Sequence, residues 1–285
     1  MTIAFLNGEY LPLEEARISP MDRGFLFGDG IYEVIPSYGG KMVGFGPHIA
    51  RMHDGLAAIE IRLGWDQARW REICETLMEK NGNGNLGIYL HVTRGMENRR
   101  NHAYPDGIEP TVFGYAFEIP PPPVPDREQI HPYTCSTGQD VRWGRCNIKS
   151  TSLLGNVLHY NQSHSRGDGE IILFNGNGEL TECGACNAYI VKDGVIATPP
   201  LDHQILPGIT RHILLAILRA DGSIPLEERV VTQDEVLNAD EIWISSSSKE
   251  VVPVVKLDGK PVGDGKPGPV WEKAARLYSA GKFDY

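Results

Sequence analysis

The proline run at residues 120–125 restricts the fold of this 285-residue chain more than any other feature. Five of these six residues are proline, within the stretch EIPPPPVPDRE. Proline lacks a backbone N–H donor and clashes with a continuing helix, so the run fits neither a helix interior nor a central strand. It predicts a short, stiff, extended connector. We therefore expect a small N-terminal α/β domain at residues 1–119, a linker at 120–126 and a larger C-terminal α/β domain at 127–285.

Both predicted domains mix short strands with helices. In the first, the turns Asn7-Gly8 and Gly39-Gly40 each separate two strand-like runs. The spacing of apolar residues predicts helices over 47–61, 66–80, 152–166, 208–220 and 269–282. Further strands are expected at 87–95, 111–119, 131–137, 170–175, 187–191 and 241–257. Because most connections between strand-like runs are short, we expect mainly antiparallel pairing and a mixed α/β (α+β) fold class.

The charge and hydropathy of the chain exclude several classes of function. The net charge is −10 and the sequence pI is about 5.4, with no block of lysines and arginines. Such a chain repels phosphate, so we expect neither a nucleic acid nor an anionic membrane as partner. No stretch approaches the roughly 18 apolar residues of a membrane span, and the N-terminus lacks the basic region of a signal peptide. Five cysteines at irregular spacing fit reduced thiols, and these features together predict a cytoplasmic protein.

Cys183 and Cys186 form a C-x-x-C within TECGACNAYIV. A structural zinc site needs four ligands, and neither a second C-x-x-C nor an H-x-x-x-H exists to supply the remainder. A thioredoxin-like redox pair would precede a helix, whereas NAYIV has the pattern of a strand. We therefore expect no metal site and no redox chemistry at this motif.

Four other features have residue types suited to chemistry. Lys149 lies just before a predicted helix, where partial burial would lower the pKa of its amine and make it more nucleophilic. The helix opening at 208–210 and the serine run at 244–248 suit an anion, because they offer free backbone N–H groups and hydroxyl donors. Arg100 and His102 lie two apart on a polar loop and are placed to clamp a carboxylate. Taken singly, each feature favours an ordinary role over a chemical one: a solvated lysine, a helix cap, a polar turn and a solvated loop.

Taken together and in order, these features resemble a known family, the fold-type IV pyridoxal-phosphate-dependent aminotransferases, and within it the bacterial D-amino acid branch. The resemblance extends over nearly the whole chain. It is carried by DRGFLFGDGIYEV (22–34), HIARM (48–52), VTRG with RNH (92–102), RWGRCNIKSTSLLGNVL (142–158), TECGACN (181–187), ILPGITR (205–211) and SSSSKEVVP (245–253). It implies a two-domain fold-type IV architecture with the cofactor, pyridoxal 5′-phosphate (PLP), at the domain interface.

The resemblance also implies which residues bind the cofactor. Lys149 matches the family's Schiff-base lysine, which shuttles a proton during the reaction. Glu182 matches the carboxylate that faces the pyridine nitrogen and keeps it protonated. Leu206 matches an apolar residue that packs against the ring. The phosphate would be met by Arg51, Ile209, Thr210, Ser246 and Ser247.

Substrate recognition is implied by a second set of residues. In the D-amino acid branch, a tyrosine after the G-D-G turn works with an Arg-x-His pair from the neighbouring subunit. Tyr32, Arg100 and His102 fit that description, so a homodimer is expected. The pair favours D-amino acids as substrates, because branched-chain L-specific relatives differ at these places.

The chain departs from the family pattern at three places. The loop bearing Arg100 is one residue longer than is typical, and Arg99 competes with Arg100 for the clamp. The turn with Cys183, Ala185 and Cys186 replaces small or hydroxylated residues, which removes hydrogen-bond donors. Lastly, PSY at 36–38 puts a proline into a strand that is expected to line the substrate region.

The predicted activity is therefore PLP-dependent transamination by a ping-pong mechanism. The amino group of a D-amino acid such as D-alanine would pass to a 2-oxo acid such as 2-oxoglutarate. Three alternatives belong to the same family: a branched-chain L-amino acid transaminase, an (R)-amine transaminase and an aminodeoxychorismate lyase. A non-catalytic zinc module built on the C-x-x-C is the alternative from another class of protein.

Overall fold

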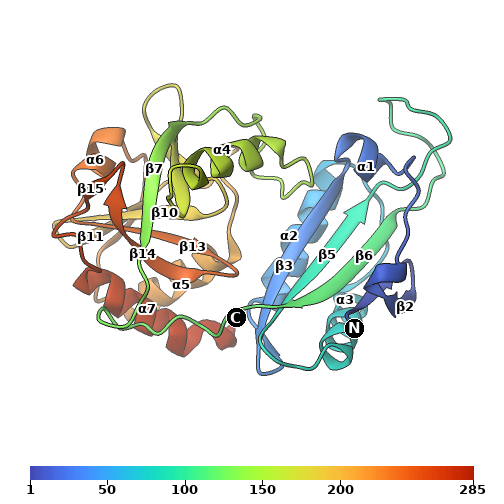
Figure 1. Ribbon diagram of the computed structural model, residues 1–285, viewed down its shortest axis with the longest axis horizontal. Coiled ribbons are helices and arrows are strands. Elements are labelled where there is room, and N and C mark those ends of the chain that lie inside the picture. Colours follow the sequence, from blue (N-terminus) through green and yellow to red (C-terminus); the bar gives the residue numbers. More distant parts are fainter. The chain divides into compact units, whose positions relative to one another are not determined.

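The computed structural model describes residues 1–285 and divides into two compact units (Figure 1). The first unit comprises Met1–Pro121, Ile148–Leu153 and Tyr285, and the second comprises Pro122–Asn147 and Leu154–Asp284. The change between units at Pro121–Pro122 falls within the proline run. The prediction assigns Ile148–Leu153, with Lys149, to the C-terminal domain, whereas the structure groups this segment with the first unit.

The first unit is built on a six-stranded antiparallel sheet with the order β2-β1-β6-β5-β3-β4. Its strands are β1 (Ile3–Leu6), β2 (Glu9–Pro12), β3 (Gly30–Tyr38), β4 (Lys41–Met42), β5 (Leu86–Thr93) and β6 (Thr111–Glu118). Its helices are η1 (Leu13–Glu15), α1 (Arg23–Phe27), α2 (Phe45–Ala58) and α3 (Gln67–Lys80). The core lies where apolar residues of α2 and α3, such as Met52 and Trp70, pack with strand residues such as Ile31 and Leu90.

The segment Ile148–Leu153 joins the first unit by pairing with β3. Strand β4 is short and pairs only with Ser37 and Tyr38, so β4 leaves most of that edge of β3 without a partner strand. The N–H of Tyr32 donates to the carbonyl of Lys149 (3.1 Å), and the N–H of Thr151 donates to the carbonyl of Gly30 (2.9 Å). Unpaired backbone N–H and C=O groups are costly when they are buried. The pairing with β3 satisfies such groups, and the segment therefore belongs to the first unit.

The second unit contains a nine-stranded sheet with the order β12-β11-β10-β13-β14-β7-β8-β9, and β15 pairs with β14. Three pairs are parallel, namely β11 with β12, β14 with β7 and β7 with β8, and the others are antiparallel. The strands are β7 (Tyr133–Gln139), β8 (Glu170–Phe174), β9 (Leu180–Cys183), β10 (Asn187–Lys192), β11 (Val195–Thr198), β12 (Leu226–Glu228), β13 (Glu241–Ser246), β14 (Glu250–Leu257) and β15 (Lys260–Pro261). The helices are α4 (Leu154–His164), α5 (Ile209–Asp221), α6 (Gln233–Leu237), α7 (Pro269–Gly281) and η2 (Lys282–Asp284).

Helix α1 was not among the predicted elements. It has only five residues, which is too short for a helical spacing of apolar residues to be recognised in the sequence. The side chain of Asp22 caps it by accepting a hydrogen bond from the N–H of Gly24 (2.8 Å). Gly28 ends it in the left-handed conformation, with φ of 66°. The motif DRGFLFGDG is therefore a short capped helix followed by the start of β3.

Candidate active site

Lys149 is held by the backbone pairing of its segment with β3. Its Nζ lies 4.2 Å from the centroid of the Tyr32 ring, so the amine is packed against an aromatic face. Within this unit the amine makes no hydrogen bond and no ion pair with a carboxylate. A lysine whose position is fixed through its backbone, and whose amine is not occupied by a carboxylate, suits attack on a carbonyl carbon.

Arg51 is part of a buried charged cluster with Glu33 and His48. Arg51 Nε and Nη2 each lie 2.7 Å from a carboxylate oxygen of Glu33, and His48 Nδ1 lies 2.7 Å from Glu33 Oε2. Burial alone would raise the pKa of the Glu33 carboxyl, but Arg51 and His48 outweigh it and hold the pKa at about 2. Glu33 is therefore ionised at neutral pH and fixes the orientation of the Arg51 guanidinium.

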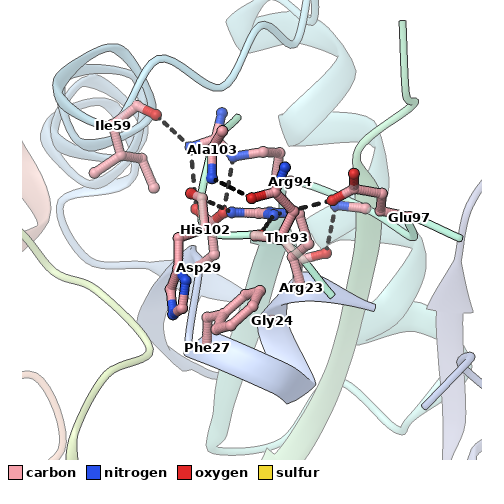
Figure 2. Close-up of polar contacts among 12 residues, drawn as sticks. Arg23, Gly24, Phe27, Asp29, Ile59, Thr93, Arg94, Glu97, His102 and Ala103 are labelled. Carbon is pink, nitrogen blue, oxygen red and sulfur yellow. Dashed lines mark hydrogen bonds and ion pairs between the residues drawn. The ribbon is translucent and has the colours of Figure 1, made fainter. Parts of the chain in front are cut away.

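Arg100 and His102 lie on the exposed loop between β5 and β6. The Arg100 guanidinium lies 5.0 Å from the centroid of the Phe27 ring, and the His102 ring lies 5.3 Å from it. Arg99 is exposed and makes neither contact. Figure 2 shows Phe27 beside His102 and close to Arg23, which binds the loop backbone. The two predicted clamp residues thus share one aromatic support on α1.

Glu182 on β9 is buried in the second unit, and both of its carboxylate oxygens accept hydrogen bonds. Its Oε1 accepts a hydrogen bond from Arg142 Nη1 (2.6 Å), and its Oε2 accepts from the N–H of Leu206 (3.0 Å) and from Asn187 Nδ2 (3.2 Å). Burial raises the pKa of the carboxyl to about 7, even though Arg142 acts to lower it. Asp140 holds Arg142 from the other side, with Nη2 and Oδ2 2.7 Å apart. The protonation state of Glu182 therefore depends on its surroundings, and its orientation is fixed by Arg142, Asn187 and Leu206.

The predicted phosphate residues of the second unit lie at two turns. Ile209 and Thr210 are the first two residues of α5 and are buried, and Gly208 caps that helix without a side chain, so its first N–H groups have no side-chain partner. Ser246 is the last residue of β13 and Ser247 begins the turn to β14, and Ser246 Oγ accepts a hydrogen bond from the N–H of Lys249 (3.2 Å). A helix N-terminus and hydroxyl groups are the donors that a phosphate dianion prefers.

Each unit offers groups of the kinds that suit pyridoxal phosphate. The first unit has a lysine amine, which suits an aldehyde, and Arg51, which suits a phosphate. The second unit has a buried carboxylate, which suits a pyridine nitrogen, and helix N–H groups and hydroxyls, which suit a phosphate. The backbone of Leu206 also helps to orient Glu182. Its N–H donates to Glu182, and its carbonyl accepts a hydrogen bond from Asn187 Nδ2 (2.9 Å). No group of three or more His, Cys, Asp or Glu side chains is placed to hold a metal ion.

The family model for class IV aminotransferases ("Amino-transferase class IV") matches residues 30–257. The chain belongs to the class IV aminotransferases. The predicted family, the mixed α/β fold class, the transferase activity and the dependence on pyridoxal phosphate are thereby confirmed.

Curated relatives of this class IV aminotransferase extend over most of its length. A D-alanine aminotransferase of Listeria monocytogenes serotype 1/2a (strain 10403S) is 39% identical over 267 residues, covering 93% of this chain and 91% of the relative. A D-alanine aminotransferase of Staphylococcus haemolyticus is 41% identical over 271 residues, covering 95% and 94%.

A solved structure shows the same fold. The branched-chain amino acid aminotransferase of Escherichia coli has a TM-score of 0.89 and 25% identity, covering 99% of this chain and 94% of that chain. A branched-chain amino acid aminotransferase from T.th., complexed with N-(5′-phosphopyridoxyl)-L-glutamate, has a TM-score of 0.88 at 21% identity, covering 99% and 94%. No helix of this class IV aminotransferase has the length and apolar character needed to cross a bilayer.

The sequence reasoning missed the residues that hold the predicted ones in place. Asp140 and Arg142 around Glu182, Glu33 and His48 around Arg51, and Arg23 beneath the loop are all buried or nearly so. A signal was available for four of them, because Arg23 and Glu33 lie inside the motif DRGFLFGDGIYEV, His48 inside HIARM and Arg142 inside RWGRCNIK. A charged residue inside an otherwise small or apolar motif is costly to bury unless it has a partner.

Proposed function

We propose that this class IV aminotransferase acts on D-amino acids, moving the amino group of a donor such as D-alanine to a 2-oxo acid such as 2-oxoglutarate in a ping-pong cycle. The observation that carries the proposal is the identity of 39% and 41% to two D-alanine aminotransferases over more than nine-tenths of each chain. The pair Arg100 and His102 on one loop supports it, since both side chains can bind the substrate carboxylate. We further propose that the enzyme works in the cytoplasm.

Each proposed residue has one task. When bound, pyridoxal phosphate supplies a protonated pyridine ring that withdraws electrons from the substrate α-carbon. Lys149 binds it covalently and carries the proton at Nζ, packed against Tyr32. Glu182 keeps the ring nitrogen protonated, and its own charge depends on Arg142. Leu206 covers the ring.

We propose that the phosphate is bound by Arg51, by the N–H groups at Ile209 and Thr210 and by the hydroxyls of Ser246 and Ser247. Glu33 holds Arg51 in a single orientation, so little side-chain entropy remains to be lost when the phosphate binds. Because Lys149 is fixed through its backbone, it delivers the proton to one face of the substrate. The carboxylate clamp therefore decides which enantiomer reacts.

We propose a homodimer in which Arg100 and His102 complete the active site of the neighbouring subunit. Helix α4 supports an interface between subunits, because Leu154, Val157 and Leu158 are 71%, 58% and 63% exposed on it. Apolar side chains gathered on one helix at this exposure are typical of an interaction surface.

The activity is tested with paired D- and L-amino acids and a single 2-oxo acid acceptor. We expect activity with D-alanine and little with L-leucine. The opposite result would favour a branched-chain transaminase, which the structural similarity to the Escherichia coli enzyme makes the second candidate. Release of pyruvate from aminodeoxychorismate would indicate a lyase, and turnover of simple (R)-amines would indicate an amine transaminase.

The role of Lys149 is tested separately. Borohydride reduction of the yellow holoenzyme should attach the cofactor covalently to Lys149, as mass spectrometry of the peptide would reveal. The Lys149→Ala protein should lose nearly all transamination. Attachment to another lysine, or full activity of the variant, would rule this role out.

Shared active sites are tested by mixing two inactive proteins under conditions of subunit exchange. A Lys149→Ala subunit keeps its clamp, and an Arg100→Ala/His102→Ala subunit keeps its lysine. If the clamp comes from the partner, each mixed dimer has one complete site and activity returns. If the clamp serves its own subunit, mixing restores nothing.

A further inference from the structure

Arg23 on α1 connects the core of the first unit to the loop that bears Arg100 and His102. Its side chain is 3% exposed. Nη1 donates to the carbonyl of Asn101 (2.6 Å), and Nη2 donates to the carbonyl of His102 (3.4 Å). Nη1 also lies 3.1 Å from Glu97 Oε2, at the start of the same loop (Figure 2). One buried guanidinium thus binds the loop at three points.

Asp29 keeps Arg23 from moving. Asp29 Oδ2 accepts hydrogen bonds from both Arg23 Nε and Arg94 Nε, each at 2.8 Å. Arg94 in turn donates to the carbonyl of Ile59 (2.6 Å), and its guanidinium lies 3.5 Å from the centroid of the Tyr104 ring, two residues after His102 on the loop. Charge-assisted hydrogen bonds shared between two arginines and one carboxylate fix both side chains. The loop is therefore anchored from its start to Tyr104 by a common charged cluster.

Phe27 adds an aromatic support at the centre of the loop. The guanidinium of Arg23 lies 4.9 Å from its ring centroid, that of Arg100 lies 5.0 Å from it, and the His102 ring lies 5.3 Å from it. Arginine packs favourably on aromatic faces, so one ring contacts the anchor and both clamp side chains.

We propose that Arg23 and Phe27 are positioning residues for the substrate-carboxylate clamp: Arg23 sets the backbone of Asn101 and His102, and Phe27 sets the side chains of Arg100 and His102. The proposal rests on the clamp role given to Arg100 and His102 above. A long, exposed loop would otherwise lose conformational entropy each time the substrate bound. Arg23 and Phe27 spare that loss by ordering the loop in advance.

This arrangement predicts an effect on binding more than on turnover. Arg23→Gln should raise the KM for both D-alanine and 2-oxoglutarate about tenfold while kcat changes less than about twofold, because it removes binding common to the ground and transition states. Phe27→Leu keeps every hydrogen bond of Arg23 and should raise both KM values by about threefold. The absorbance of the bound cofactor should match the wild type in both variants.

A matched control is available in the same unit. Arg69 also has a carboxylate partner, Glu72 at 2.7 Å, and an aromatic ring, Trp65 at 5.4 Å, but it has no contact with the loop. Arg69→Gln should leave both KM values unchanged. Propionate, which has a carboxylate but no amine, should perturb the cofactor spectrum of the holoenzyme at higher concentrations in the Arg23 and Phe27 variants than in the control.

Two different outcomes would contradict the positioning role, and only the second would also contradict the clamp. If Arg100→Ala raises KM but Arg23→Gln and Phe27→Leu do not, the clamp stands and the positioning role fails. If Arg100→Ala and His102→Ala leave KM unchanged, the clamp proposal itself fails, and the positioning role fails with it. Should Arg23→Gln not fold, Phe27→Leu and Arg23→Lys still distinguish these cases, because each retains a side chain of similar size.

Discussion

Arg142 and Glu182 form a buried ion pair in which Nη1 and Oε1 lie 2.6 Å apart and the two side chains are 3% and 7% exposed. Burial disfavours the charged form of the carboxyl, while the guanidinium favours it, and the two effects leave the pKa of Glu182 at about 7. The charge of the proposed partner of the cofactor nitrogen therefore depends on a residue 40 positions away in the sequence.

Replacing Arg142 by methionine should neutralise Glu182. Without the guanidinium, burial raises the pKa of the carboxyl further above 7, so Glu182 stays protonated at pH 8. We expect kcat at pH 8 to fall about tenfold or more and to recover partly as the pH rises, when the carboxyl ionises. The measurement is kcat against pH for the variant, with Arg145→Met, an exposed arginine of the same motif, as control. A pH profile like that of the wild type would contradict this interpretation.

Replacing Glu33 by glutamine should reduce the stability of the apoprotein at neutral pH. The folded pKa of Glu33, about 2, lies below its ordinary value of 4.5. A lowered pKa contributes stability above pH 4.5 that is lost as the pH falls towards 2, and here it amounts to about 3 kcal/mol. Urea unfolding should show this difference in the free energy of unfolding between the two proteins at pH 7. The difference should become smaller below pH 4.5.

His48 and Arg51 both face Glu33, and the Glu33 carboxylate acts to raise the pKa of His48. The comparison therefore measures the carboxyl together with its effect on the His48 imidazole. Burial lowers the pKa of His48, which makes both proteins lose stability as the pH falls below about 6.5. Glu79→Gln, an exposed glutamate on α3, should match the wild type at every pH. If the free energies of unfolding of wild type and Glu33→Gln differ by the same amount at pH 7 and pH 3, ionisation of Glu33 is not the origin of the lost stability.

The thiols of the native protein should react slowly with oxidants and alkylating reagents. All five cysteines are free and buried. Burial raises the pKa of Cys186 to about 12 and that of Cys146 to about 11, so almost no thiolate exists at pH 8. A thiol-titrating dye should detect fewer than about one fast-reacting cysteine in the native enzyme and all five in denaturant. Loss of activity in peroxide together with oxidised Cys186 in the peptide map would refute this.

Replacing Gly208 by alanine should disturb the hydrogen bonds that Asn187 makes to Glu182 and Leu206. A Cβ at this position would clash with Asn187 Oδ1, and Asn187 is bonded to both Glu182 and the carbonyl of Leu206. The asparagine must move, which breaks these bonds and costs about 1–3 kcal/mol. Thermal unfolding of the apoprotein should show a lower Tm, and cofactor titration should show a higher Kd. Gly176→Ala, where a Cβ meets nothing within 4 Å, should change neither value.

The sequence predicts best those features that repeat over many residues. Helix α3 runs over Gln67–Lys80 against a predicted 66–80, because its apolar period is complete and Asp66 caps it. The family follows from seven ordered motifs, none of which depends on knowing the fold. The proposed roles of Lys149 and Glu182 follow from the same motifs.

Pairs of residues that lie far apart in the sequence are harder to predict. The partner of Glu182 could have been any of several arginines, and Arg142 is distinguished only by burial in the folded chain. The anchoring of the loop by Arg23 depends on backbone carbonyls at Asn101 and His102, which every residue has. Backbone acceptors have no sequence signal, so such contacts require coordinates.

The grouping of Ile148–Leu153 with the first unit has a consequence for the order of events during synthesis. A ribosome that has finished residues 1–121 has made every strand of the six-stranded sheet, yet part of the β3 edge has no partner until residue 153 emerges. A truncated chain ending in the proline run should therefore expose an unpaired strand edge and associate with itself. The lysine of the proposed chemistry lies on the segment that closes this edge, so the nascent chain acquires Lys149 and the closing backbone pairs together.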